Sequence, residues 1–433
     1  MASSVVYDIR EEGVLVMPDQ PTIALPLDLP DVRVLRTNVT TDRELIIEVE
    51  STLTTTTCRR CGQTISAFYG YDRPIRLRHL PSFGYVVYIE IRPKRFRCPV
   101  CDDHPTTTQR MSWYDPKALH TTAYERYLLL QLINSTIVDV CHKEDVTPDA
   151  IQGIVDRWVE TEIDWSTVPA FSIIGMDEIA LKKGHRDFIA IVTARLPNGT
   201  LDLLAVLPDR TKETVRTWLQ SIPAPTRLQI RTVCTDMWEA YVAAVQEILP
   251  GAALVIDRFH VAQHYRDGAD SLRKQELKRL RKHLPKDEAK VLKKTLWPFR
   301  KRAADLETDE QARLDAFFAH SPQLKAAYTF REQLTTIFDT ARSKAAGLRQ
   351  IRAWCRKVEA SALSCFDPFL KLLDTWLDLI ANYFRHRQSS GFVEGFNNKL
   401  KVLKRRCFGI YNLNHLFQRI TLDLHGYRRF SPW

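Results

Sequence analysis

Acidic residues stand directly after apolar runs at two places in the chain. Asp177 and Glu178 follow the run at 173–176, and Asp236 follows the run at 233–235. A carboxylate in a buried strand is costly unless a cation or a partner neutralises it. Hard divalent cations bind carboxylate oxygens, and two such ions can activate an attacking water and stabilise the leaving oxygen in phosphodiester chemistry. We therefore expect a metal site here; for Asp236 the alternative is the N-cap of a following helix.

A third acid, Glu394, stands in a predicted helix near the end of the chain. It shares one helical face with amides and cations at i+3, i+4, i+7 and i+11. A carboxylate continuous with a basic ladder suits a metal ligand beside a phosphate-binding surface; the alternative is an ordinary amphipathic surface helix. The predicted nucleic-acid contacts here are Asn397, Asn398, Lys401, Lys404, Arg405 and Arg406, and the predicted apolar face is Val393, Leu400, Leu403 and Cys407.

Four of the nine cysteines form two C-x-x-C pairs, Cys58 with Cys61 and Cys98 with Cys101, separated by 36 residues. Each pair can present two thiolates to one tetrahedral Zn²⁺, and two pairs complete a closed structural site. A strand predicted at 85–92 lies between the pairs, which favours a zinc ribbon. The alternative is four unconnected buried cysteines; the other five have no such spacing and are predicted core residues.

The chain of 433 residues has a formal net charge of +10, and this charge is gathered in segments. Residues 266–302 carry +9, whereas 58–110 and 385–406 carry +6 each. Such segments favour a nucleic-acid partner over solvated helix faces. No apolar run of 18 residues, no signal-like N-terminus and no glycine-rich nucleotide-binding motif occur. We therefore expect a cytoplasmic protein without a membrane partner.

Between residues 171 and 256 the pattern predicts five strands. Three apolar runs separated by short glycine-containing turns are typical of a meander, and helix and strand alternate after them. This is the element order of the ribonuclease-H-like fold, in which the first and fourth strands are neighbours. Since consecutive strand residues point to opposite faces, only one of Asp177 and Glu178 should reach the site. The predicted strands are 171–181, 186–195, 200–207, 228–234 and 252–256, with helices at 211–222 and 238–249.

Residues 121–160 are predicted to form three short helices. Thr147 and Pro148 are typical of an N-cap followed by proline at the first helical position. Helix, short turn and helix is the arrangement of a helix-turn-helix. The exposed face of the third helix is not basic, so both sequence recognition and a packing or dimer role stay open. That face carries Asp149, Gln152, Asp156 and Arg157.

Together these residues resemble the DDE transposases of bacterial insertion sequences, specifically the ISL-three family, over nearly the whole chain. Each motif alone is unspecific, but their order is specific. The motifs are C-x-x-C-G…R-x-L-P…R-x-F-x-C-x-x-C from Cys58 to Cys101, G-M-D-E at Gly175–Glu178, T-D-x-x-x-x-Y at Thr235–Tyr241, D-R-F-H-V at Asp257–Val261, and V-E-G-F-N-N-K-L-K…R…G at Val393–Gly409.

The resemblance implies that Asp177, Asp236 and Glu394 are the catalytic triad and hold two Mg²⁺ or Mn²⁺ ions, beside one structural Zn²⁺. His260, in a D-x-x-H element with Asp257, contacts DNA or orients a ligand; the alternative is an N-cap with a packed histidine. The family's helical insertion is expected at 261–385, within the 157 residues that separate Asp236 from Glu394. There Trp297 either stacks on an unpaired base or belongs to the core.

The predicted fold class is α/β and multidomain: a ribonuclease-H-like catalytic core interrupted by an all-helical insertion, preceded by a zinc ribbon and a helix-turn-helix. The expected boundaries are 1–50 for a β-rich segment, 51–112 for the zinc ribbon, 113–166 for the helix-turn-helix, 167–260 for the first part of the core, 261–385 for the insertion and 386–433 for the last part of the core.

The expected activity is cutting at terminal inverted repeats and joining of the ends to target DNA. The expected partner is double-stranded DNA, both the terminal inverted repeats and the target. A homodimer or higher assembly is expected on DNA, because two ends must be joined in one complex. The alternatives are a non-enzymatic DNA-binding regulator derived from a transposase, and a ribonuclease-H-like nuclease without strand transfer. All three acids are present, which disfavours the regulator.

Overall fold

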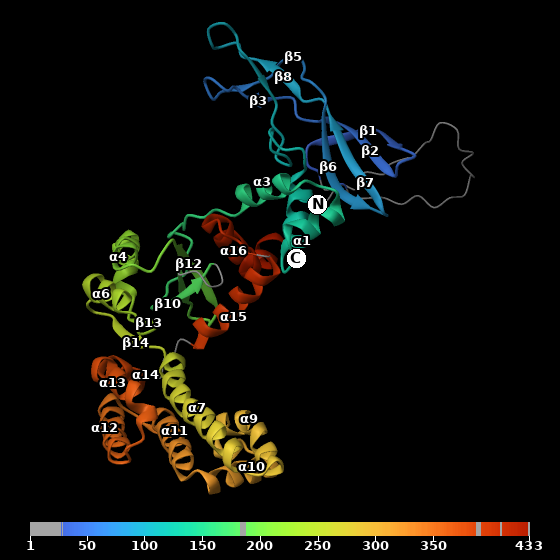
Figure 1. Cartoon of the computed structure of the whole chain (residues 1–433). Coiled ribbons are helices and arrows are strands. Elements are labelled where there is room, and N and C mark those ends of the chain that lie inside the picture. Colours follow the sequence, from blue (N-terminus) through green and yellow to red (C-terminus); the bar gives the residue numbers. More distant parts are fainter. Residues whose placement is uncertain (1–26, 28, 182–187, 387–390, 408, 432–433) are drawn as a thin grey trace. The chain divides into compact units, whose positions relative to one another are not determined.

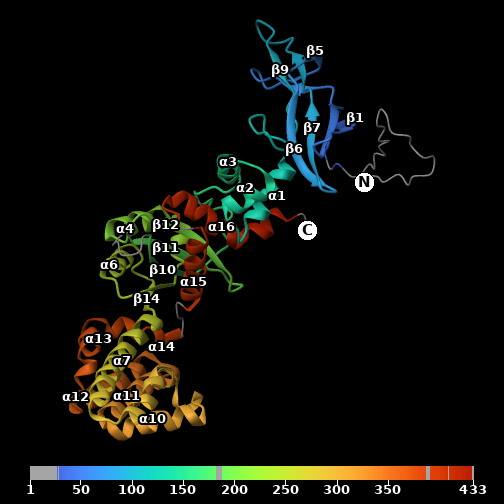
Figure 2. The ribbon, with the colours of Figure 1, turned by 45° about the vertical axis from the view of Figure 1, so that its right-hand side comes forward.

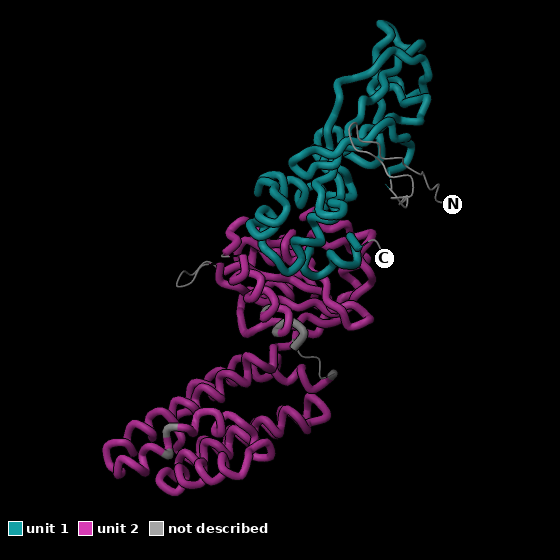
Figure 3. Tube along the Cα trace, turned by 90° about the vertical axis from the view of Figure 1, so that its right-hand side faces the viewer, with its two compact units in different colours: residues 1–159, 422–433 teal, residues 160–421 magenta. Residues whose placement is uncertain are grey.

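The computed structural model describes residues 27, 29–181, 188–386, 391–407 and 409–431 (Figure 1). The chain divides into two compact units, residues 1–159 with 422–433 and residues 160–421 (Figure 3). The predicted turn at Lys183-Gly184 and the first part of the predicted N-terminal segment lie outside the described residues. None of the described helices is long and apolar enough to cross a membrane.

The first unit contains a four-stranded sheet with the order β1-β2-β7-β6. The predicted strand at 85–92 is confirmed as β7, but it pairs with β2 in parallel and with β6 antiparallel. The hairpin between the cysteine pairs therefore joins the sheet of the preceding strands, because its alternating apolar side chains share their core. The strands are β1 (Val32–Val39), β2 (Glu44–Ser51), β6 (Ile75–Ser82) and β7 (Tyr85–Ile91).

The cysteine pairs are carried instead by two small sheets. One is the pair β3 (Thr56–Thr57) and β4 (Thr64–Ile65), and the other has the order β5-β8-β9. Phe96 and Ile65 form a small core with Cys58 and Cys98. Such a core is too small to hold the module alone, which makes a metal crosslink the expected support. The strands of the second sheet are β5 (Ala67–Tyr71), β8 (Lys94–Arg97) and β9 (Thr106–Thr108).

The predicted trihelical segment is confirmed as α1 (Thr122–Leu132), α2 (Ile137–Glu144) and α3 (Pro148–Trp158). Thr147 caps α3 by accepting from the Ala150 amide, and proline occupies the first turn. Leu422 and Phe430 of α16 (Leu413–Phe430) complete the core of these helices. The last helix of the chain therefore belongs partly to this module, which sequence spacing did not indicate.

The second unit is built on a five-stranded sheet with the order β12-β11-β10-β13-β14. The meander β10-β11-β12 is antiparallel, whereas β10, β13 and β14 run parallel. Figures 1 and 2 show α4 and α6 on one side of the sheet and α15 on the other. The elements are β10 (Ile173–Ala180), β11 (Phe188–Arg195), β12 (Leu201–Leu207), α4 (Lys212–Ser221), β13 (Thr232–Thr235), α6 (Glu239–Ile248), β14 (Ala253–Ile256) and α15 (Gly391–Arg406).

The fourth strand starts later than predicted. Residues 228–229 belong to α5 (Ala224–Gln229), which has a proline in its first turn, and β13 begins at Thr232. The prediction placed Leu228 at the start of the strand, but this residue is 77% exposed. Its apolar character therefore misplaced the start of the strand, while the end near Asp236 was placed within one residue.

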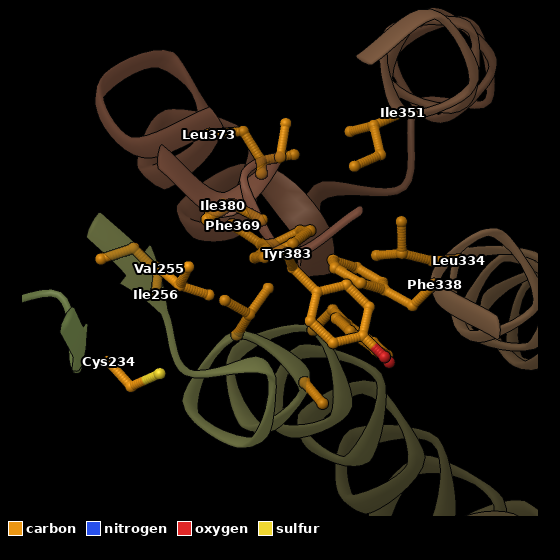
Figure 4. Packing of buried hydrophobic residues seen from close by; sticks show 14 of the residues in the cluster. Cys234, Val255, Ile256, Leu334, Phe338, Ile351, Phe369, Leu373, Ile380 and Tyr383 are labelled. Atoms are coloured by element: carbon orange, nitrogen blue, oxygen red, sulfur yellow. The ribbon is translucent and has the colours of Figure 1, made fainter. Parts of the chain in front are cut away.

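The described residues from 258 to 386 form helices joined by short connections, as the sequence predicted for 261–385. Their apolar faces continue the core of β14, as Val255 and Ile256 meet Phe369, Ile380 and Tyr383 (Figure 4). The sheet and this helical segment therefore share one core. The helices are α7 (Arg258–His283), α8 (Lys286–Val291), α9 (Leu296–Arg300), α10 (Thr308–His320), α11 (Pro322–Thr340), α12 (Lys344–Ala360), α13 (Asp367–Ile380) and α14 (Tyr383–His386).

Candidate functional site

Three aspartates stand at matching positions, Asp177 within β10 and Asp236 and Asp257 directly after the parallel strands β13 and β14. Gly175 pairs with Cys234, and Asp177 and Asp236 each follow two residues later. Thr235 pairs with Ile256, so Asp257 stands level with Asp236 after the next strand. Parallel strands bring their carboxyl ends to one edge of a sheet, where α/β folds bind ligands. The register therefore collects Asp177, Asp236 and Asp257 at one edge.

Burial, followed by the nearby charges of Glu178 and Asp177, raises the pKa of Asp236 to about 7. Burial also raises the pKa of Asp177, while the backbone amide of Glu178 and the charge of His260 act in the opposite direction. Carboxylates collected in a half-buried edge therefore repel one another, and a proton or a cation relieves that repulsion.

Asp236→Asn is expected to alter how the stability of the metal-free protein depends on pH. Because the folded pKa of Asp236 is raised to about 7 from 3.8, its ionisation costs stability as pH rises through this interval. Between pH 5 and pH 7 the wild type should lose roughly 2 kcal/mol relative to the variant, at about 1.4 kcal/mol per pKa unit. Urea unfolding in EDTA measures this difference; parallel pH profiles for the two proteins would contradict it.

Glu178, the neighbour of Asp177, is bound to an arginine. Its Oε1 accepts from Arg210 Nη1 at 2.6 Å, and its Oε2 is buried without a hydrogen-bond partner among the described residues. The guanidinium carbon of Arg210 lies 3.8 Å from the Trp238 ring centroid and 4.3 Å from that of Phe188. Sequence spacing gave no signal for Arg210, because it stands alone in the turn before α4.

Asp236 and Asp257 differ in their relation to the following helix. The N-cap position of α6 is Trp238, which makes no side-chain capping bond, so the capping alternative for Asp236 was wrong. Asp257 is buried and caps α7, since its Oδ1 accepts from the Phe259 amide at 2.9 Å. His260 Nε2 lies 4.0 Å from Asp257 Oδ2, with the imidazole about one-third exposed at 34%.

The predicted late helix is confirmed as α15, and it contacts β10. Lys404 is half-buried and donates to the Ala180 carbonyl at the end of β10, and burial lowers the pKa of its amine. Leu400 and Leu403 are buried as predicted. The structure does not describe the side chains of Glu394 and Asn397. Of the predicted DNA contacts on this helix, Asn398, Lys401 and Arg405 are exposed and Arg406 is half-buried.

Trp297 of α9 is 67% exposed, so the alternative that it belongs to the core was wrong. The Arg300 guanidinium lies 5.6 Å from its ring centroid. Arg300 and Phe259 line a cavity of about 320 Å³ with Gln263, Arg266 and Asp267. An exposed indole among cations offers a stacking surface for a base.

The four cysteines of the two pairs lie together. Sγ of Cys58 is 3.9 Å from that of Cys101, and Sγ of Cys61 is 3.8 Å from that of Cys98. Sulfur atoms in a tetrahedral site with Zn–S bonds of about 2.3 Å lie about 3.8 Å apart, so the geometry fits zinc. Among the side chains that the structure describes, this is the one group of three or more ligand atoms within 4.8 Å of one another.

The charges of the cluster also fit a cation. Backbone amides of Cys61 and Arg60 lower the pKa of the Cys58 thiol to about 6, which favours a thiolate. The pKa of the Cys101 thiol is raised to about 12, first by a hydrogen bond with Cys61 and then by burial. One thiolate therefore disfavours the next until a metal ion compensates them.

Comparisons with known proteins agree with this organisation. Residues 174–420 match a family described as transposase, of the type DDE ISL3, residues 109–159 match the helix-turn-helix domain of transposase family ISL3, and residues 54–101 match the zinc-finger of transposase IS204/IS1001/IS1096/IS1165.

Two curated relatives span nearly the whole chain. The transposase for insertion sequence element IS1001 of Bordetella parapertussis is 26% identical, over 89% of this chain and 93% of the relative. The transposase for IS1557 of Mycobacterium tuberculosis is 24% identical, over 87% of each chain. A solved Drosophila P element transposase strand transfer complex aligns at 10% identity with a TM-score of 0.39, over 72% of this chain and 93% of that chain. The match to the transposase family covers residues 174–420, more than half of this chain, and the chain therefore belongs to the ISL3 family of transposases.

Proposed function

We propose that this transposase binds the terminal inverted repeats of an insertion sequence, cuts the DNA strands there and joins the ends to target DNA. The observation that carries the proposal is the alignment of Asp177, Asp236 and Asp257 at the edge of a parallel sheet. The strand order β12-β11-β10-β13-β14 supports a ribonuclease-H-like core. The helices from 258 to 386 are then an insertion that separates this core from Glu394 on α15.

Asp177, Asp236 and Glu394 are the proposed ligands of two Mg²⁺ or Mn²⁺ ions. Asp177 and Asp236, whose pKa values are raised by burial, are a donor set that fits a hard divalent cation. When bound, the ions polarise the scissile phosphate and lower the pKa of an attacking water or hydroxyl. Asp257 fixes the start of α7 and faces His260, which is placed to orient a ligand or to donate to DNA.

Cys58, Cys61, Cys98 and Cys101 are the proposed ligands of one structural zinc ion. The tetrahedral sulfur spacing and the lowered pKa of Cys58 support this assignment. A closed set of four thiolates leaves no open position for a substrate, so the ion serves to fold the module.

The proposed DNA-binding surface includes exposed residues from two helices of the second unit. Asn398, Lys401 and Arg405 follow one face of α15, and Trp297 stands beside Arg300 on α9. Asn397 and Arg406 are proposed from their positions on the same helix. Lys404 is bound to the Ala180 carbonyl, so its role is to hold α15 against β10 beside the DNA.

The proposed modules are the β-rich segment 1–50, the zinc ribbon 51–112, the helix-turn-helix 113–166, the core 167–260 and 386–433, and the insertion 261–385. The end of α16 is the exception, because Leu422 and Phe430 pack with the helix-turn-helix. The pairing of β2 with β7 means that the first two modules share a sheet and form one folded body. A homodimer or higher assembly on paired ends is proposed because both ends must be cut and joined together.

The test uses the purified full chain and a plasmid that carries the two ends of its own insertion sequence. We expect cut and joined products with Mg²⁺ but none with EDTA, and a complex of at least two protein copies on paired ends by mass photometry. Lys401→Ala and Trp297→Ala should weaken end binding, and Lys401→Ala should lower its salt dependence. End binding without any cutting would instead support the regulator.

A further inference from the structure

Arg210 is held beside the acidic edge by three partners. Its Nη1 donates to Glu178, and its guanidinium carbon lies close to the ring centroids of Phe188, at 4.3 Å, and Trp238, at 3.8 Å. Trp238 is fixed in turn, because its Nε1 donates to the Arg210 carbonyl at 3.0 Å. Two aromatic contacts and an ion pair leave this guanidinium little rotational freedom, which is the condition for a preorganised anion site.

Arg210 has further N–H donors besides the one that Glu178 accepts. Within the described part of the chain, its Nε and Nη2 have no acceptor, and the side chain is 25% exposed. The Arg210 charge is also close enough to Asp236 to lower the pKa of that acid. A guanidinium that is anchored at one nitrogen and open at the others can bind a phosphate through charge-assisted hydrogen bonds.

Arg210 is the one counter-ion of Glu178 among the residues that the structure describes. The second carboxylate oxygen of Glu178 is buried and has no hydrogen-bond partner within this described part of the chain. Tyr241 Oη is likewise buried without a hydrogen-bond partner among the described residues. Burial is the main cause that raises the pKa of this tyrosine, and the charge of Glu178 is the next. Glu178 therefore anchors Arg210 at a cost in desolvation, which suits a functional constraint more than a stabilising one.

We propose that Arg210 is a catalytic residue that binds a non-bridging oxygen of the phosphate to be cut, and that Glu178 is its positioning residue and no metal ligand. This inference rests on the proposed function, since it requires the scissile phosphate at the edge formed by Asp177 and Asp236. Donors aimed at the charge that develops on a phosphate stabilise the transition state more than the ground state. Arg210 therefore affects the cutting rate more than the affinity for DNA.

The first experiment measures single-turnover cutting at saturating end DNA and Mg²⁺. Arg210→Ala should slow cutting by about 10²- to 10³-fold, as for the loss of one preorganised donor, with end affinity nearly unchanged. Arg210→Lys should recover little, because an ammonium offers neither the planar fork nor the stacking faces. The matched control is Arg216→Ala on α4, whose arginine is 29% exposed and paired with Glu213 at 2.5 Å; it should cut at the wild-type rate.

The second experiment separates phosphate binding from simple neutralisation of Glu178. If Arg210 only compensates the buried carboxylate, Arg210→Ala combined with Glu178→Gln should regain the wild-type rate, and the proposal is then wrong. We expect the double variant to remain as slow as Arg210→Ala. Glu178→Gln alone should slow cutting only a few fold, because an amide can still accept from Arg210.

Mn²⁺ titration of the proteins without DNA tests the role of Glu178. Glu178→Gln should bind Mn²⁺ as the wild type does, whereas Asp177→Asn should bind it more weakly. Equal losses in the two variants would make Glu178 a metal ligand and overturn its assignment. A wild type that does not cut in the first experiment would refute the proposed function itself, whereas normal cutting by Arg210→Ala would refute only the role of the arginine.

Discussion

Asp177→Asn, Asp236→Asn and Glu394→Gln should each reduce Mg²⁺-dependent cutting and joining by about a thousandfold or more. Ligands of catalytic metal ions support several kcal/mol of transition-state stabilisation, and each 1.36 kcal/mol corresponds to about a factor of ten in rate. End binding should remain, because basic residues and the zinc module supply the affinity. Removing a carboxylate also makes the edge less repulsive to phosphate. Cutting of labelled end DNA and gel-shift binding of the same DNA measure the two properties separately.

The matched control for these variants is Glu247→Gln, which removes a charge from a carboxylate that is 43% exposed and paired with Lys212. It should leave both cutting and binding unchanged. Substantial strand transfer by Glu394→Gln would show that the third acid lies elsewhere. Glu359 and Asp378 are then the next candidates; both line a cavity of about 630 Å³ at α12 and α13.

The edge with Asp177 and Asp236 could be predicted because local patterns determine it. Alternating apolar runs and glycine-containing turns define the meander, and the order of helices and strands then places β13 next to β10. Both acids follow runs that are largely buried, and their apolar character made the cost of a carboxylate there visible from the sequence. Their level alignment with Asp257 follows from the parallel register, which sequence alone does not specify.

Contacts between distant segments could not be predicted. Arg210 stands 32 residues from Glu178 and acquires its role only when β10 and the turn before α4 meet. The same holds for α16, whose Leu422 enters the core of α1 and α3, and for β7, whose partner β2 precedes the first cysteine pair. Apolar alternation identifies a strand but does not identify which neighbour covers it. The exposed Leu228 shows the converse error, since an apolar residue beside a turn needs no core.

Cys98→Ser is expected to abolish stoichiometric zinc binding and to weaken end binding by roughly tenfold or more, equivalent to about 1.4 kcal/mol. Cys98 is fully buried in the small core with Phe96 and Ile65, so its loss removes both a ligand and a packing contact. Zinc binding supplies folding free energy to a module of this size, and three remaining thiolates do not close the site. Metal analysis of the purified protein and gel-shift titration with end DNA measure the two effects.

Cys141→Ser provides the matched control, because this half-buried cysteine of α2 lies in the same unit and outside the cluster of four. It should retain one zinc ion per chain and normal end affinity. The second unit has its own core, so Cys98→Ser should keep the Mn²⁺ affinity of the acidic edge even where it no longer recognises the ends. Full zinc content in Cys98→Ser would refute the four-thiolate assignment. Loss of zinc with unchanged end binding would instead assign recognition to the helix-turn-helix, where the Asp149 and Asp156 face of α3 would have to read DNA despite its acidic charge.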